Sequence, residues 1–85
     1  MSTELTLEFS DSSWVEVYDA AGQRLFYDIG QPGRSRVLTG AAPLNVVIGV
    51  ASAVKVQVND RAVVIPRRAN RDSARFTVEA DGSVR

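Results

Sequence analysis

The chain has 85 residues, of which 45% are hydrophobic and 24% charged. A chain this short forms a single hydrophobic core, which excludes a second domain, and this composition is typical of a folded protein rather than a disordered one. Ten basic and ten acidic residues give a formal net charge of zero, which argues against a general nucleic-acid binder, because such proteins carry a strong positive field.

Short segments in which apolar and polar residues alternate recur along the chain, and many of the apolar residues are valine. A period of two in β-branched residues predicts strands. The predicted strands are residues 5–9, 14–18, 24–28, 35–39, 44–48, 54–58, 62–65 and 74–78. Seven or eight short strands, with no helical pattern longer than one turn, predict a small antiparallel β-sandwich, immunoglobulin-like. We expect one domain over residues 1–85, with its core at about 4–79 and a tail at 80–85, cut from a larger protein.

Turn-forming residues separate the predicted strands. Gly22 closes a hairpin turn because glycine adopts positive φ without strain. Asn59 and Asp60 form a two-residue hairpin turn, since both residue types tolerate the left-handed region that a type I′ turn requires. Residues 30–33 and 40–43 are predicted loops, and Pro66 ends the seventh strand.

Histidine and cysteine are both absent, which removes the usual general base, the thiol nucleophile and the common transition-metal ligands. Glu16 and Asp19 are close in sequence, but one lies mid-strand and the other begins a turn, so they do not form an opposed catalytic pair. No glycine-rich phosphate loop precedes a helix. We therefore expect no enzyme activity, no catalytic residue, no metal and no cofactor, and in isolation we expect a monomer.

Trp14, Glu16 and Tyr18 form the first candidate binding site. Alternation places them on one face of a strand, while Val15 and Val17 occupy the other. If the valines face the core, two aromatic residues flank a carboxylate on an outer surface, where such side chains often anchor partners. In the alternative interpretation, Trp14 folds under a loop as a residue at the edge of the core.

Arg67, Arg68 and Arg71 form the second candidate site, in the loop after Pro66, and Arg61 or Arg75 could join them. Guanidinium groups bind carboxylates and phosphates in a bidentate manner. The alternative is a solvated loop whose charges prevent strands from associating edge to edge.

Several segments, taken together, resemble the C-terminal periplasmic domain of the bacterial cell-shape protein RodZ. The likeness runs from about Leu5 to Val78. It is carried by residues 13–17, Asp19, Ala20, Gly22, Leu25, residues 38–40, 42–44 and 48–49, Val54, Val56, Val58 and residues 74–78. Tyr18 departs from the family pattern, which usually has a small polar residue there, and Asp60 stands where the family tends to have glycine.

The resemblance implies a non-catalytic domain at the periplasmic face of the inner membrane. Its parent, a larger membrane-anchored protein, would link filaments of the actin-like protein MreB to the cell-wall elongation machinery and so maintain rod shape. The partners implied are periplasmic parts of elongation-complex proteins, with no nucleic acid bound through this domain, which is itself soluble. Two alternatives are a peptidoglycan-binding module and a passive spacer.

Overall fold

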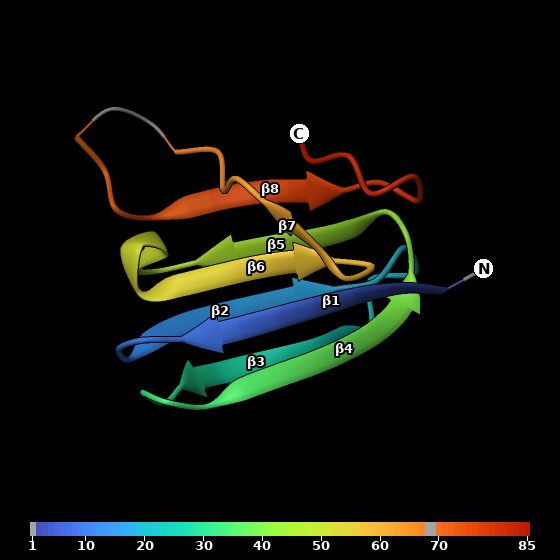
Figure 1. The fold of residues 1–85 in the computed structure, drawn as a ribbon. Helices are drawn as coiled ribbons and strands as arrows, with labels where there is room; N and C mark the ends of the chain where they lie inside the picture. Colours follow the sequence, from blue (N-terminus) through green and yellow to red (C-terminus); the bar gives the residue numbers. More distant parts are fainter. Residues whose placement is uncertain (1, 68–69) are drawn as a thin grey trace.

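The computed structural model describes residues 2–67 and 70–85, which form two four-stranded antiparallel sheets packed face to face (Figure 1). One sheet has the order β4-β1-β6-β7 and the other β3-β2-β5-β8. The elements are β1 (Ser2–Phe9), β2 (Ser13–Tyr18), β3 (Arg24–Gly30), β4 (Ser35–Ala41), β5 (Leu44–Ile48), the 3₁₀ turn η1 (Ala51–Ala53), β6 (Val54–Val58), β7 (Arg61–Val63) and β8 (Ala74–Val78). The predicted antiparallel β-sandwich is confirmed, and its immunoglobulin-like character stays a prediction. None of the helical segments in the described part of the chain is long and apolar enough to span a membrane.

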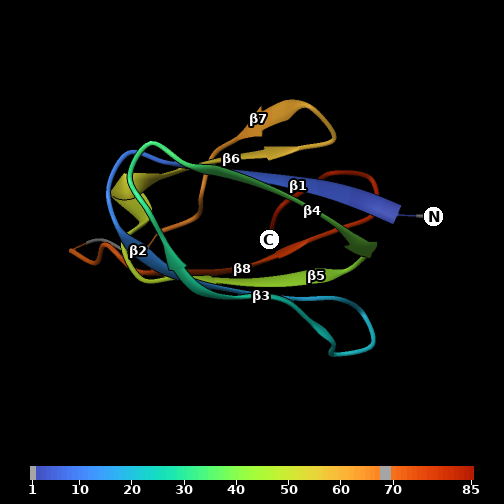
Figure 2. The same cartoon turned by 90° about the horizontal axis from the view of Figure 1, so that it is seen from below.

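The core fills the space between the two layers, which Figure 2 shows edge-on. Every second residue of each long central strand points into it, as the alternation predicts. Full burial of one such side chain stabilises the fold by about 1.5–3 kcal/mol. The fully buried side chains are Leu5, Leu7, Val15, Val17, Leu44, Val46, Ile48, Val58 and Val78.

The predicted turn at Asn59 and Asp60 is confirmed, with φ of 50° and 67°. Asn59 also ties this hairpin to β1. Its backbone N–H donates to the Glu4 carbonyl at 2.9 Å, and its side-chain Oδ1 accepts from the Glu4 N–H at 3.0 Å. Gly22 has a φ of 81°, which confirms the role predicted for it.

Several strand boundaries differ from the sequence prediction. β1 begins at Ser2 and β2 at Ser13, earlier than predicted, and β3, β4 and β7 change as well. β3 continues to Gly30 and β4 to Ala41, into residues predicted as loops. β4 is longer because it pairs with almost all of β1, from Ser2 to Glu8, and those backbone hydrogen bonds outweigh the weak strand propensity of glycine and alanine. β7 is shorter because the chain leaves the sheet after Val63, which leaves Val64 89% exposed.

Gly30 is buried at the end of β3, where the ring of Phe9 crosses from the other sheet. A Cβ at Gly30 would lie 2.1 Å from the Phe9 ring. The sequence prediction used Gly30 only as a loop former. Its φ is not positive, however, and what the fold requires is the absence of a side chain.

Replacing Gly30 with alanine should therefore lower the free energy of unfolding by about 1–3 kcal/mol, the usual cost of overpacking. Gly49→Ala is the matched control, because its added Cβ would lie 3.4 Å from the Trp14 Cβ and needs only a small adjustment. Urea unfolding followed by tryptophan fluorescence measures both. Equal stability of the two variants would contradict this account of Gly30.

Replacing Asp60 with glycine in the turn at Asn59 and Asp60 should raise the free energy of unfolding by about 0.5–1 kcal/mol, because glycine occupies the left-handed region without strain. Asp60→Ala should lower it, since alanine lacks the polar side chain that tolerates this conformation. The same denaturation experiment ranks the three proteins. Equal stability of the Asp60→Ala and Asp60→Gly proteins would contradict this prediction.

Candidate functional site

β2 places the first candidate site on the outer face of its sheet. Val15 and Val17 are fully buried, so Trp14, Glu16 and Tyr18 point outward, where each is partly exposed. The interpretation that Trp14 folds under a loop as a core-edge residue does not describe this arrangement. Alternation along β2 therefore gives the correct faces for all five residues.

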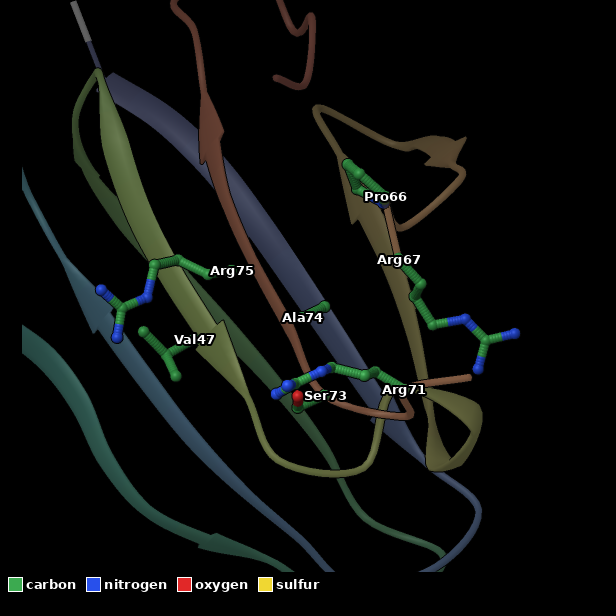
Figure 3. Close-up of a pocket in the computed structure, with 7 residues that line it drawn as sticks. All are labelled: Val47, Pro66, Arg67, Arg71, Ser73, Ala74 and Arg75. Atoms are coloured by element: carbon green, nitrogen blue, oxygen red, sulfur yellow. The ribbon is translucent and has the colours of Figure 1, made fainter. Parts of the chain in front are cut away.

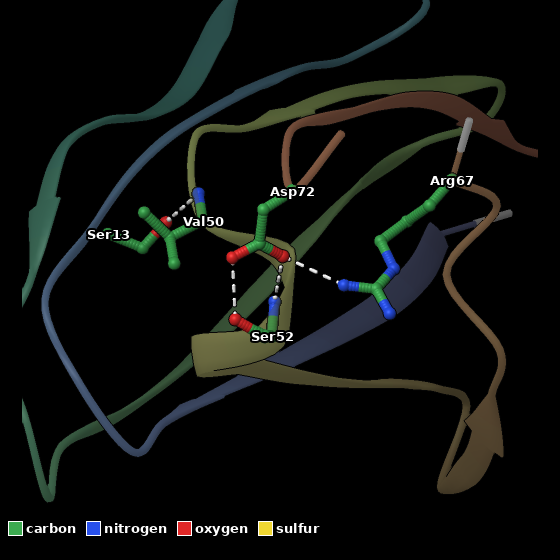
Figure 4. Close-up of polar contacts among 5 residues, drawn as sticks. All are labelled: Ser13, Val50, Ser52, Arg67 and Asp72. Atoms are coloured by element: carbon green, nitrogen blue, oxygen red, sulfur yellow. Dashed lines mark hydrogen bonds and ion pairs between the residues drawn. The ribbon is translucent and has the colours of Figure 1, made fainter. Parts of the chain in front are cut away.

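The backbone around Trp14 is held in place by the loop that follows β5. The Trp14 carbonyl accepts hydrogen bonds from the Gly49 N–H at 2.8 Å and from the Ser13 hydroxyl at 3.1 Å. The buried Ser13 hydroxyl in turn accepts from the Val50 N–H at 3.0 Å (Figure 4). These bonds fix the start of β2 and hence the position from which the indole projects.

The Glu16 carboxylate links the two aromatic side chains on either side of it. The Trp14 Nε1 donates to one carboxylate oxygen at 2.8 Å, and the Tyr18 hydroxyl donates to the other at 2.5 Å. The bonds from Trp14 and Tyr18 lower the pKa of Glu16, because they favour its charged form, and Arg75 and Arg24 add a smaller effect. The bond to Glu16 raises the pKa of Tyr18.

Two residues of β3 extend this surface, and the sequence analysis did not identify them as site residues. The ring of Tyr27 meets Trp14 edge to face, with ring centroids 4.8 Å apart, and the Arg24 guanidinium lies 4.5 Å from the Tyr27 centroid. Ile29 lies opposite Trp14 and is 48% exposed. The sequence feature that indicates Tyr27 is its neighbour Phe26. Because Phe26 is buried, the alternation of the strand forces Tyr27 outward. We call Trp14, Glu16, Tyr18, Tyr27 and Ile29 the aromatic face.

The second candidate site is a groove of about 600 Å³ beside β8. It is lined by Val47, Pro66, Arg67, Arg71, Ser73, Ala74 and Arg75, and we call it the arginine groove (Figure 3). The side chains of Arg71 and Arg75 reach towards Val47 on the outer face of the sheet, whereas Arg67 points the other way. Arg68 lies outside the described residues.

Asp72 holds the loop of the arginine groove against η1. Its carboxylate accepts hydrogen bonds from the Ser52 hydroxyl at 2.6 Å and the Ser52 N–H at 2.9 Å, and it pairs with Arg67 at 2.8 Å (Figure 4). The bonds from Ser52 lower the pKa of Asp72, and Arg67 lowers it further. Arg67 is therefore engaged within the loop, while the structure describes no ion pair for Arg71 or Arg75.

The two candidate sites, which the sequence analysis treated separately, lie side by side on one sheet. A second groove, of about 410 Å³, is lined by Glu16 and Tyr18 of β2 and also by Arg75 of β8. Val47 and Arg75 line both grooves. Glu16 of β2, Val47 of β5 and Arg75 of β8 occupy one cross-strand row, which also includes Tyr27. The aromatic face and the arginine groove are thus continuous.

Comparison with known proteins identifies one family. A family model described as the RodZ C-terminal domain matches residues 6–77, which is most of the chain and includes all residues of the aromatic face and of the arginine groove. No solved structure matches the chain. Over the residues that the structure describes, no group of three or more acidic side chains is placed to hold a metal ion.

The hydrogen bonds of Glu16 predict a pH dependence that Trp14 should report. Because the pKa of Glu16 in the folded protein lies below its ordinary value of 4.5, these bonds stabilise the fold fully above that value. Their contribution is lost as the pH falls through the lowered pKa. We expect the Trp14 emission and the NMR signal of its Nε1 proton to change with a midpoint below pH 4.5.

Glu16→Gln should abolish this transition, and Tyr18→Phe should move its midpoint towards 4.5 by removing one of the two donors. A midpoint at or above 4.5 in the unaltered protein, or an unchanged transition in Glu16→Gln, would show that the carboxylate does not hold the indole.

Proposed function

Because this chain belongs to the RodZ C-terminal domain family, we propose that it is the non-catalytic interaction domain of a RodZ-like protein, at the periplasmic face of the bacterial inner membrane. In this proposal the parent protein links MreB filaments to the cell-wall elongation machinery and maintains rod shape. The domain docks on the periplasmic parts of elongation-complex proteins through its outer sheet face.

The observation that carries the proposal is the continuous surface formed by the aromatic face and the arginine groove. The solvent face of an antiparallel sheet is normally polar. Here Tyr27 and Ile29 are about half exposed, next to a partly exposed Trp14 and Val47. Tryptophan, tyrosine and arginine are the residues most enriched among those that dominate binding energy in protein interfaces.

The rings of this surface are held in place by contacts within the domain. The Glu16 carboxylate fixes the ring orientations of Trp14 and Tyr18, and Tyr27 packs against the Trp14 ring. A side chain that is already ordered loses less conformational entropy on binding, and this saves about 0.5–1.5 kcal/mol for each side chain. This preorganisation supports a binding role.

A peptidoglycan fragment is a second candidate ligand, favoured by the aromatic residues that flank a carboxylate beside a groove. Each oxygen of Glu16 already accepts a bond, from Trp14 or Tyr18, which leaves the carboxylate about half of its acceptor sites for sugar hydroxyls. The engaged carboxylate therefore favours a protein partner.

Trp14→Ala in the parent protein should reduce capture of elongation-complex proteins from solubilised membranes at least about tenfold, as expected when a central aromatic anchor is removed. The isolated domain should keep its fold, because the indole lies outside the core. Val37→Ala is the matched control, since Val37 is 60% exposed on the other sheet. Capture is quantified by immunoprecipitation and the fold by circular dichroism.

Unchanged capture by a folded Trp14→Ala protein would overturn the proposal. NMR titration of the domain with muropeptides decides the second candidate: shifts confined to Trp14, Tyr18 and Tyr27 would establish glycan binding in place of protein docking.

A further inference from the structure

The edge of β8 forms backbone hydrogen bonds with another segment of the chain. Residues after the last turn fold back along this edge, and the Thr77 N–H and carbonyl both exchange hydrogen bonds with Arg85, at 3.0 and 2.9 Å. Val78 and Val84 form an isolated antiparallel bridge beside them. In Figure 1 the C-terminal segment lies along one half of β8, and the loop that leads into β8 lies beyond the other half. The edge is therefore able to pair with an added strand.

The next pairing position on this edge is Arg75. In an antiparallel ladder the backbone groups of alternate residues point to the same side. Because those of Thr77 point to the outer edge, those of Arg75 do so too, and those of Phe76 point to β5. Among residues 2–67 and 70–85, none forms a backbone hydrogen bond with Arg75 on that side.

The surroundings of this position are basic. Arg75 lies in the arginine groove together with Arg71, and their side chains lie on the same side of β8, next to Ser73 and Val47 (Figure 3). Of the nearby acids, Asp72 is bound by Ser52 and Arg67, and Glu16 by Trp14 and Tyr18. The backbone of Arg75 is thus open at this edge. Beside it lie two guanidinium groups for which the structure describes no carboxylate partner.

We propose that the edge of β8 at Arg75 binds an extended acidic segment of a partner protein by strand addition. The segment's backbone pairs with the Arg75 N–H and carbonyl, in line with the chain's own residues 84–85. A residue directly opposite Arg75 projects on the same face as the Arg75 side chain. An acidic residue there meets Arg75 and Arg71.

The same geometry sets the pattern of the bound segment. Its neighbouring residues point to the opposite face, the side on which Ala74 and Phe76 face the core, so they are apolar. The segment therefore alternates acidic and apolar residues. Backbone pairing supplies affinity and the alternate side chains supply specificity, as in other complexes formed by strand addition. This inference rests on the proposed function and adds the chemistry of the partner.

The test is an NMR titration of the ¹⁵N-labelled 85-residue chain with the peptide acetyl-Val-Glu-Val-Glu-Val-amide. We expect the Arg75 amide signal to shift and its hydrogen exchange to slow at least tenfold at saturation. The matched peptide with lysine in place of glutamate should not bind. Methylation of the backbone nitrogens of both glutamates should weaken binding at least tenfold, because the glutamate opposite Arg75 then lacks the donor to the Arg75 carbonyl.

Protein variants test the basic residues separately. Arg71→Gln should weaken binding of the glutamate peptide three- to tenfold, and Lys55→Gln, on the outer face of the other sheet, should leave it unchanged. Three results would each overturn the inference: no change at the Arg75 amide in millimolar peptide, equal binding of the lysine peptide, or equal binding of the methylated peptide.

Failure of this inference is distinguishable from failure of the proposed function. If the peptide does not bind while Trp14→Ala still reduces partner capture, only the edge site is wrong. If the peptide binds as expected while Trp14→Ala captures partners normally, only the docking role of the aromatic face is wrong.

Discussion

Strand β2 carries two sets of side chains whose positions cannot be chosen independently. Val15 and Val17 are fully buried, and the two-residue period of a strand then forces Trp14, Glu16 and Tyr18 onto the outer face. A slip of one residue would bury the carboxylate and expose the valines, so burial of the core fixes the binding surface as well. β2 is paired on both sides, with β3 and β5, and the register of those pairs places Tyr27 and Val47 beside Glu16. Core and candidate site are thus consequences of one constraint.

The formal net charge is zero, but acidic and basic groups are unevenly available on the surface. Glu16 and Asp72 each satisfy their oxygens within the domain, one with aromatic donors and the other with Ser52 and Arg67. Once these acids are engaged, the outer face of β8 is left with the arginines that have no described partner. Screening at physiological salt limits the range of exposed charges to about 8 Å, so this local arrangement matters more for a partner than the total charge.

The two sides of the sandwich, where the edges of the sheets lie, are covered by different groups. Where β3 and β4 meet, the Arg36 guanidinium lies 5.3 Å from the centre of the Phe26 ring, and the Phe9 ring fills the space that Gly30 leaves free. On the other side, Val84 and Arg85 pair with only part of the β8 edge. An edge strand with unpaired backbone groups can pair with another chain, and natural proteins usually restrict such pairing with charged side chains. Arg75 belongs to this class of residue, and its charge also selects which chains can approach.

The sequence by itself determined the sandwich class, the strands at residues 44–48, 54–58 and 74–78, the left-handed turn at Asn59 and Asp60, and the outward direction of Trp14, Glu16 and Tyr18. Each follows from local physics, because side-chain alternation and the allowed φ of single residues depend on a few neighbouring positions. Only the tertiary structure decided that Tyr27 packs on Trp14, that Val47 and Arg75 join the two candidate sites, and that Gly30 makes room for Phe9. These contacts join residues distant in sequence, and they depend on which strands become neighbours and in what register. That choice is made by packing of the whole core, and no local pattern encodes it.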